Sequence, residues 1–223
     1  MSAIPIEDNW ARSDLYHNSF LLGPDEVLDF AKANAEKNGL PDIAVSAAQG
    51  KYLSLLVRSL GVKRILEVGT LGGYSTIWLA RGLPEDGELI TLELQEHHAT
   101  VARENIARAG LANKVTVIQG AAADSLKKLP SDKPFDFVFI DADKPGNLTY
   151  FLEAKRLTRK GAVIIVDNVV RQGKVADPTN ADPRVEGVRA LLKHLKTDNE
   201  VEATTIATVG EKGWDGYTYI VKL

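Results

Sequence analysis

Cysteine is missing from the 223 residues, so the chain can form no disulfide, no thiolate nucleophile and no Cys-based zinc site. An excess of basic charge is missing as well. The 27 Lys and Arg residues are outnumbered by 30 Asp and Glu residues, which argues against a nucleic-acid-binding surface. Because a chain without cysteine fits a reducing compartment, we expect a cytoplasmic protein.

Long apolar runs are also missing. No stretch approaches the roughly 20 apolar residues that a membrane-spanning helix requires, so we expect no membrane partner. The segment Met1 to Trp10 carries Glu7 and Asp8 and no apolar run, and it does not resemble a signal peptide. The overall composition is that of a globular protein, with 44% hydrophobic and 26% charged residues, which is enough apolar material for a substantial core.

From Arg64 onward, short apolar segments alternate with amphipathic segments that suit helices. The apolar segments predict strands at 64–69, 88–94, 114–120, 135–142 and 162–168, and the segments between them predict helices at 75–82, 97–109, 121–129 and 148–159. Continuous apolar runs are typical of strands that are covered on both faces. Repeated strand–helix alternation therefore predicts an α/β fold with a doubly wound parallel sheet and helices on both faces.

The C-terminal part breaks this alternation. Asp182 and Pro183 suit the start of a helix. A strand rich in Thr and Val at 201–209 is followed by a glycine-flanked turn at 210–216 and a last strand at 217–222. Strands joined by so short a turn must be antiparallel. The sequence thus predicts a mostly parallel seven-stranded sheet that ends in an antiparallel C-terminal hairpin.

Two helices are predicted before the sheet. Residues 24–26 suit a first helical turn, and Gly39 suits its stop. Residues 46–49 have the spacing of a capping box, for a helix that ends at Gly61. Since no strand accompanies these helices, we expect them to cover the carboxyl edge of the sheet or to form a dimer contact.

No linker or internal repeat divides the chain. We therefore predict one domain over residues 1–223, with an N-terminal helical cover over 1–62 and a Rossmann-like core over 63–223.

A glycine-rich turn, Glu67 to Ser75, joins the first predicted strand to its helix. In open α/β sheets the first strand–helix turn usually carries the cofactor. Leu71 stands where a dinucleotide fingerprint needs its second glycine, and the turn has no P-loop lysine. Glu93, which ends the next strand, can accept hydrogen bonds from both hydroxyls of a ribose. Glu67 disfavours phosphate but suits the charge of S-adenosylmethionine, so this cofactor is favoured over a plain tight turn.

Oxygen-bearing side chains end the fourth and fifth predicted strands. If these strands are neighbours, Asp141, Asp167 and Asn168 converge at one sheet edge, which suits a hard cation such as Mg²⁺. The alternative is that each aspartate caps a helix or contacts the cofactor, and for Asp143 the cofactor contact is favoured. Lys144 follows directly. Beside a cation and a sulfonium its pKa would fall, and it could then accept a proton from a hydroxyl, whereas a surface lysine is the alternative.

Together these motifs resemble the cation-dependent O-methyltransferases that include caffeoyl-CoA and catechol O-methyltransferases, and the caffeoyl-CoA-like and bacterial members most. The similar segments are Leu21–Pro24, Ser46–Gly50, Glu67–Ser75, Phe137–Lys144, Val166–Val170 and Asp215-Gly216. The resemblance implies a Rossmann-like class I methyltransferase that uses S-adenosylmethionine and Mg²⁺, or another divalent cation such as Mn²⁺ or Ca²⁺. It also implies a homodimer.

Residue by residue, the resemblance makes Lys144 the catalytic base. It implies metal ligands at Asp141, Asp167 and Asn168. It implies cofactor contacts at Val45, Glu67, Gly69, Thr70, Ser75, Glu93, Ala122 and Asp143. Gln172 falls where the plant enzymes have a substrate-contacting Asn.

The implied reaction is methyl transfer to one hydroxyl of a catechol-like phenol, whose two vicinal oxygens are bound by the metal. A methyltransferase that acts on nitrogen or without a metal is one alternative. A non-catalytic cofactor-binding module is another, although an intact set of metal ligands and base argues against it.

The acceptor itself is not specified by these motifs. Its pocket is expected to come from loops and terminal segments. The candidates are residues 1–20 with Trp10 and Tyr16, the loop 169–184, and Trp214.

Overall fold

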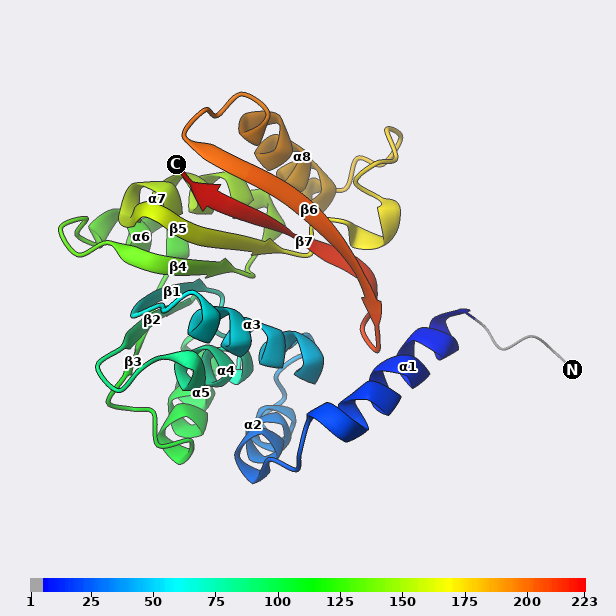
Figure 1. Cartoon of the computed structure of the whole chain (residues 1–223), viewed down its shortest axis with the longest axis vertical. Helices are drawn as coiled ribbons and strands as arrows, with labels where there is room; N and C mark the ends of the chain where they lie inside the picture. Colours follow the sequence, from blue (N-terminus) through cyan, green and yellow to red (C-terminus); the bar gives the residue numbers. More distant parts are fainter. Residues whose placement is uncertain (1–5) are drawn as a thin grey trace, which may run out of the picture.

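A seven-stranded sheet in the order β3-β2-β1-β4-β5-β7-β6 forms the centre of the molecule (Figure 1). The computed structural model describes residues 6–223. The parallel strands are β1 (Arg64–Val68), β2 (Glu88–Glu93), β3 (Val115–Gln119), β4 (Phe135–Ile140) and β5 (Thr158–Asp167). β7 (Gly213–Lys222) pairs antiparallel with both β5 and β6 (Val201–Gly210). The predicted fold class is therefore confirmed.

Helices cover both faces of this sheet. Successive residues of a strand point to opposite faces, so Ile65 and Phe137 pack in one core and Leu66 and Val138 in the other. The first core contains residues of α2 (Glu26–Lys37), α3 (Ala47–Ser59), α4 (Tyr74–Gly82) and α5 (Glu96–Arg108). The second contains residues of α6 (Ala122–Lys128), α7 (Asn147–Leu157) and α8 (Pro183–Leu195). This double burial explains why the inner strands are continuously apolar.

The sequence did not predict α1 (Ile6–Leu21), which projects from the body of the molecule in Figure 1. Its main contacts are with β6, β7 and α3, and the Asp14 carboxylate accepts a hydrogen bond from the Glu211 amide at 2.9 Å. Leu15 and Phe20 stay more than 60% exposed. Because no apolar stripe of α1 is buried in the core, the helix leaves little periodic signal in the sequence. No helix within residues 6–223 is long and apolar enough to cross a membrane.

Two predicted boundaries were wrong. β5 begins at Thr158, inside the segment predicted as helix, because a register shift lets Thr158 pair with Phe135 before the regular pairing of Val163 with Phe137. The C-terminal hairpin is also tighter than predicted. β7 pairs with β6 up to Gly213, so the turn consists of residues 211–212 and not 210–216.

The strand order reverses at β1. The chain runs from β1 through β2 to β3 on one side and then returns to place β4 on the other side of β1. Such a switch point is where open α/β sheets bind ligands. Here the glycine-rich turn meets the end of β4, since the Asp141 amide donates to the Val68 carbonyl at 2.8 Å. A Cβ atom on Gly69 would lie 2.0 Å from the Asp141 carbonyl oxygen, so only glycine fits.

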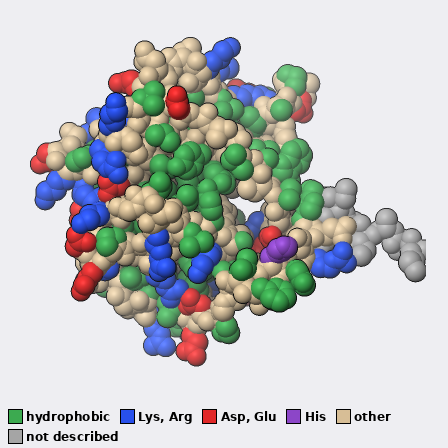
Figure 2. All heavy atoms as spheres, in the orientation of Figure 1, with side chains coloured by type: hydrophobic (Ala, Val, Ile, Leu, Met, Phe, Trp, Pro, Cys, Tyr) green, Lys and Arg blue, Asp and Glu red, His purple; other side chains and the backbone are tan. Residues whose placement is uncertain are grey.

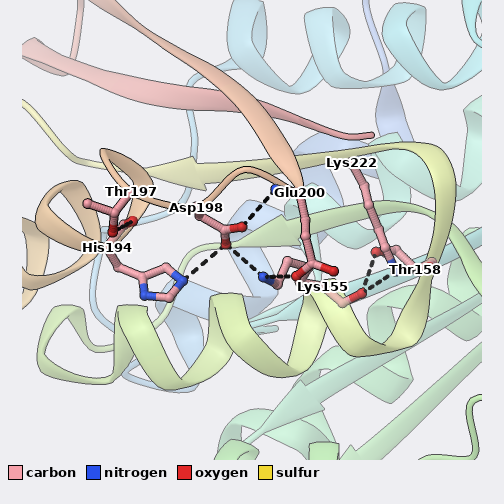
Figure 3. A network of polar contacts seen from close by, with 7 residues as sticks. All are labelled: Lys155, Thr158, His194, Thr197, Asp198, Glu200 and Lys222. Carbon is pink, nitrogen blue, oxygen red and sulfur yellow. Dashed lines mark hydrogen bonds and ion pairs between the residues drawn. The ribbon is translucent and has the colours of Figure 1, made fainter.

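Away from that edge, a polar network fastens α7 and α8 to the start of β6 (Figure 3). The Lys155 ammonium lies 2.7 Å from carboxylate oxygens of both Asp198 and Glu200, and the His194 imidazole lies 3.1 Å from Asp198. Burial disfavours the charge of Asp198, but the hydrogen bonds from Lys155, the Glu200 amide and His194, together with the charge of Lys155, hold the pKa of this carboxyl below its ordinary value. The network therefore stabilises the fold when Asp198 is ionised.

We expect Asp198→Ala to lower the free energy of unfolding by about 1–3 kcal/mol at neutral pH, because it leaves Lys155 with one carboxylate fewer. The loss should shrink below about pH 4, where the carboxyl of the wild-type protein becomes protonated in the unfolded and then in the folded state. Urea denaturation at several pH values measures both effects. Glu202→Gln, a substitution at an exposed position of β6, is the control. An equal loss of stability in both variants would contradict a stabilising role for the Asp198 network.

Candidate active site

A cavity of about 620 Å³ lies along the carboxyl ends of the parallel strands, at the switch point. The predicted site residues that line it are Val45, Gly69, Thr70, Ser75, Glu93, Ala122, Asp141, Asp143, Lys144 and Asn168. The two others, Glu67 and Asp167, are 0% and 4% exposed and are not among its lining residues. The fold thus gathers into one place residues that are more than a hundred positions apart in the chain.

Glu93 holds the glycine-rich turn from the end of β2. One oxygen of its carboxylate accepts hydrogen bonds from the Leu71 amide at 2.8 Å and the Thr70 amide at 3.3 Å, and the other accepts from the Gln95 amide at 2.9 Å. Leu71 adopts a left-handed backbone with φ of 49°. A carboxylate has about four acceptor positions, so Glu93 keeps capacity for a ribose hydroxyl.

Glu67, predicted as a cofactor contact, is fully buried next to the turn. Its oxygens accept hydrogen bonds from the hydroxyls of Ser75 at 2.6 Å, Thr91 at 2.7 Å and Thr76. Burial raises the pKa of Glu67 to about 7, although these three hydroxyls favour its charged form. With its oxygens taken by hydroxyls of α4 and β2, Glu67 supports the turn from inside the protein.

Asp141, Asp167 and Lys144 form a compact charged cluster at the ends of β4 and β5. The paired register of Ile140 and Val166 places the two aspartates side by side. Lys144 is 6% exposed, and its side-chain nitrogen lies 2.8 Å from an Asp141 carboxylate oxygen. Burial and the charge of Asp141 together raise the pKa of Asp167 to about 7, although Lys144 opposes this shift.

The cluster has the donor chemistry of a site for a hard cation. Within residues 6–223 no group of three or more His, Cys, Asp and Glu side chains is placed to hold a metal ion. The predicted ligands are instead two carboxylates, Asp141 and Asp167, and the amide oxygen of Asn168. Carboxylate and amide oxygens suit Mg²⁺, which usually keeps several water or substrate ligands as well.

Sequence reasoning missed the role of Gln49. The predicted capping box forms only in part: the Ser46 hydroxyl accepts from the Gln49 amide at 3.1 Å, as expected. The Gln49 side chain, however, donates to the Asp167 carboxylate at 2.7 Å and thereby ties the start of α3 to the carboxyl edge of the sheet. Nothing in the local sequence distinguishes these two uses of a glutamine at this position.

The loop after β4 is held from two sides. Asp143 accepts hydrogen bonds from the Tyr150 hydroxyl and from the Gly146 amide, the latter at 3.1 Å. On the other side, α8 packs against the backbone of Lys144. A Cβ atom on Gly187 would lie 2.1 Å from the Lys144 carbonyl oxygen, so this glycine permits the close approach. Both contacts fix the position of Lys144.

The segment 169–184, predicted as a contributor to the acceptor pocket, does reach the cavity. Arg171 lines it from the loop after β5 and Arg184 from the first turn of α8, whereas Gln172 is exposed and does not. Among the described residues Trp10, Tyr16 and Trp214 do not line it either, and the predicted contribution of residues 1–5 lies outside the described part of the chain.

For the cofactor-free protein we expect Glu67→Gln to gain stability relative to wild type as the pH rises. The raised pKa of Glu67 means that its stabilising protonated form is complete below about pH 4.5 and is lost through about pH 7. The difference between the two proteins should change by about 1–3 kcal/mol between about pH 5 and about pH 8. Urea denaturation at both values measures it. Glu202→Gln should show no such trend. A parallel trend in both variants would contradict the raised pKa of Glu67 as the cause.

Comparisons with known proteins agree with this geometry. The family model described as O-methyltransferase matches residues 23–222. A catechol O-methyltransferase of Mycobacterium tuberculosis is 49% identical over 205 residues, which cover 92% of each chain.

Two solved structures are similar throughout. An O-methyltransferase of Bacillus cereus in complex with S-adenosylhomocysteine (SAH) has a TM-score of 0.96 and 47% identity, over 98% of this chain and 100% of that one. TomG of Streptomyces achromogenes, an O-methyltransferase of tomaymycin synthesis in complex with S-adenosylmethionine (SAM), has a TM-score of 0.94 and 46% identity, over 98% and 99%. The resemblance seen in the sequence is thereby confirmed, and the chain belongs to the O-methyltransferase family.

Proposed function

We propose that this O-methyltransferase transfers a methyl group from S-adenosylmethionine to one hydroxyl of a catechol-like acceptor and requires a divalent metal ion. The observation that carries the proposal is the juxtaposition of two groups at the switch point. The cavity lined by the glycine-rich turn adjoins the cluster of Asp141, Asp167, Asn168 and Lys144. The named cofactors of the two similar structures support S-adenosylmethionine. The name of the mycobacterial relative supports a catechol.

Each group of residues would have a separate role in the reaction. Glu93 would hold the ribose at the end of β2, while the turn that contains Gly69 and Thr70 would position the methyl donor. Asp141, Asp167 and Asn168 would hold the metal. A divalent cation bound there would supply a Lewis acid that lowers the pKa of an acceptor hydroxyl.

We assign the uptake of that proton to Lys144, whose side chain would act as the neutral amine and become an ammonium. Lys144 is 6% exposed at the cavity wall. Its side-chain nitrogen is held by Asp141, and its backbone is held by the approach of α8. General bases in such positions typically contribute on the order of 10²–10⁴-fold to a rate. Fixed placement of donor and acceptor in one cavity would contribute further.

We expect Asp167→Ala to lose metal-stimulated methyl transfer and to weaken Mn²⁺ binding by at least about 100-fold, because a metal ligand and its negative charge are removed. Binding of S-adenosylmethionine should be retained. Electron paramagnetic resonance of Mn²⁺ and calorimetry with the cofactor measure the two affinities, and methyl transfer to a panel of catechols measures activity.

Asp177→Asn, an exposed change in the loop 169–184, is the matched control and should leave all three readouts unchanged. Wild-type turnover that persists after chelation of divalent metal would overturn the metal requirement and favour a metal-independent enzyme. Methylation of an amine in place of a hydroxyl would overturn the catechol assignment.

We also propose that the protein forms a homodimer through α1. This helix presents the apolar side chains Leu15, Tyr16, Phe20 and Leu21, which are 63%, 64%, 72% and 73% exposed. In Figure 2 hydrophobic side chains lie on the surface over this helix. A contiguous exposed apolar patch is typical of a protein–protein interface.

Phe20→Asp with Leu21→Asp should convert the dimer into a monomer, because two charges would be buried without partners. Analytical ultracentrifugation measures the molecular mass in solution. The Leu223 side chain lies away from α1 in the sequence and is 48% exposed, so Leu223→Asp should leave the dimer intact. A monomeric wild-type protein would rule out this proposal while leaving the methyl-transfer proposal untouched.

A further inference from the structure

The loop that follows β5 has an unusual backbone. Asn168, Arg171 and Gln172 all have left-handed φ values, of 54°, 51° and 56°. This conformation is unfavourable for residues other than glycine and persists only where the surrounding structure enforces it. Such residues concentrate at functional sites, so the backbone of this loop indicates a functional role.

Asp215 of β7 enforces the conformation. One oxygen of its carboxylate accepts hydrogen bonds from the Val170 amide at 3.1 Å and the Arg171 amide at 2.8 Å. The Val169 amide donates to the Gly216 carbonyl at 2.9 Å, which fixes the loop to the same strand. The loop is therefore rigidly attached to the sheet.

The consequence is the placement of Arg171. Its side chain lines the cavity together with Asn168 and Lys144. The Nε atom is buried and has no hydrogen-bond partner among the described residues. A buried guanidinium nitrogen without a partner is unfavourable, and each such case in a native protein needs an explanation.

The other cations that line this part of the cavity already have anionic partners. Lys144 is paired with Asp141 at 2.8 Å. Arg184 donates to both oxygens of Asp182, at 3.0 and 3.1 Å from its Nε. For the Arg171 side chain, no ion pair with another described side chain is formed. Among the described cations in this part of the site, Arg171 is thus the one without an anionic partner at ion-pair distance.

We propose that Arg171 selects acceptors that carry a carboxylate in addition to the two vicinal hydroxyls. A guanidinium presents parallel N–H donors whose geometry matches the two oxygens of a carboxylate, and this pairing is specific as well as strong. A site whose donors are otherwise unpartnered also rejects an uncharged analogue, because its donors would stay unsatisfied. The inference rests on the proposed function and names its substrate class.

The test compares acids with their uncharged isosteres. Dihydroxyphenyl acids with the carboxylate attached directly or through a two-carbon spacer are assayed beside the corresponding amides, with Mg²⁺ and S-adenosylmethionine. For the acid of fitting length, the wild-type enzyme should have a kcat/KM on the order of 10- to 100-fold above that of its amide. Methylation of neither member of any pair would be a failure of the proposed function, whereas equal rates for acid and amide would overturn only this inference.

Variants at the site isolate the role of Arg171. In Arg171→Gln the preference for the acid should be lost through a rise of KM for the acid alone, with the amide unaffected. Arg171→Lys keeps the charge but not the two parallel donors and should retain part of the preference. Lys174→Gln, an exposed cation on the same loop, should retain all of it.

Two outcomes contradict the assignment. An equal loss for acid and amide in Arg171→Gln would show a structural role for the side chain. Weaker binding of S-adenosylmethionine in that variant, measured by calorimetry, would show that Arg171 holds the carboxylate of the cofactor and not that of the acceptor.

Discussion

Burial of carboxylates at the carboxyl edge of the sheet is the constraint on which the site depends. Glu67 and Asp167 are buried at this edge, and burial raises the pKa of each to about 7. A buried carboxylate is tolerated only where hydrogen-bond donors surround it. The donors come from distant segments: three hydroxyls of α4 and β2 for Glu67, and the Gln49 amide of α3 for Asp167. The two carboxylates therefore hold the glycine-rich turn and α3 in place.

The same constraint couples the two halves of the site. Gly69 admits the backbone of Asp141 at a distance that no side chain would allow. The turn that would carry the cofactor and the strand end that would carry the metal are thus parts of one packed unit. For a reaction between two bound partners this matters, because a rate that depends on positioning is lost when the two subsites shift independently.

Features that repeat along the chain, or that depend only on neighbouring residues, could be predicted from the sequence. Continuous apolar runs identified the parallel strands, and the polar residues at their ends include Glu93, Asp141 and Asn168, which line the cavity. The role of Gln49 could not be predicted, because its partner Asp167 is 118 positions away and a capping glutamine looks the same. Helix α1 was missed because it buries little apolar surface. Arg171 was missed because its placement follows from a backbone that Asp215 enforces from another strand.

The loop after β5 is held differently from the turn and the cluster, which has a consequence for substrate specificity. Residues of the turn and of the cluster hold one another, so a change in any of them disturbs methyl transfer as a whole. The loop after β5 is different: Asp215 fixes its backbone through main-chain amides, and these donate irrespective of side chain. A substitution at Arg171 can therefore alter the chemistry of the acceptor end without moving Asn168 or the strands beneath it. The structure thus separates the residues that determine the reaction from one that would determine its substrate.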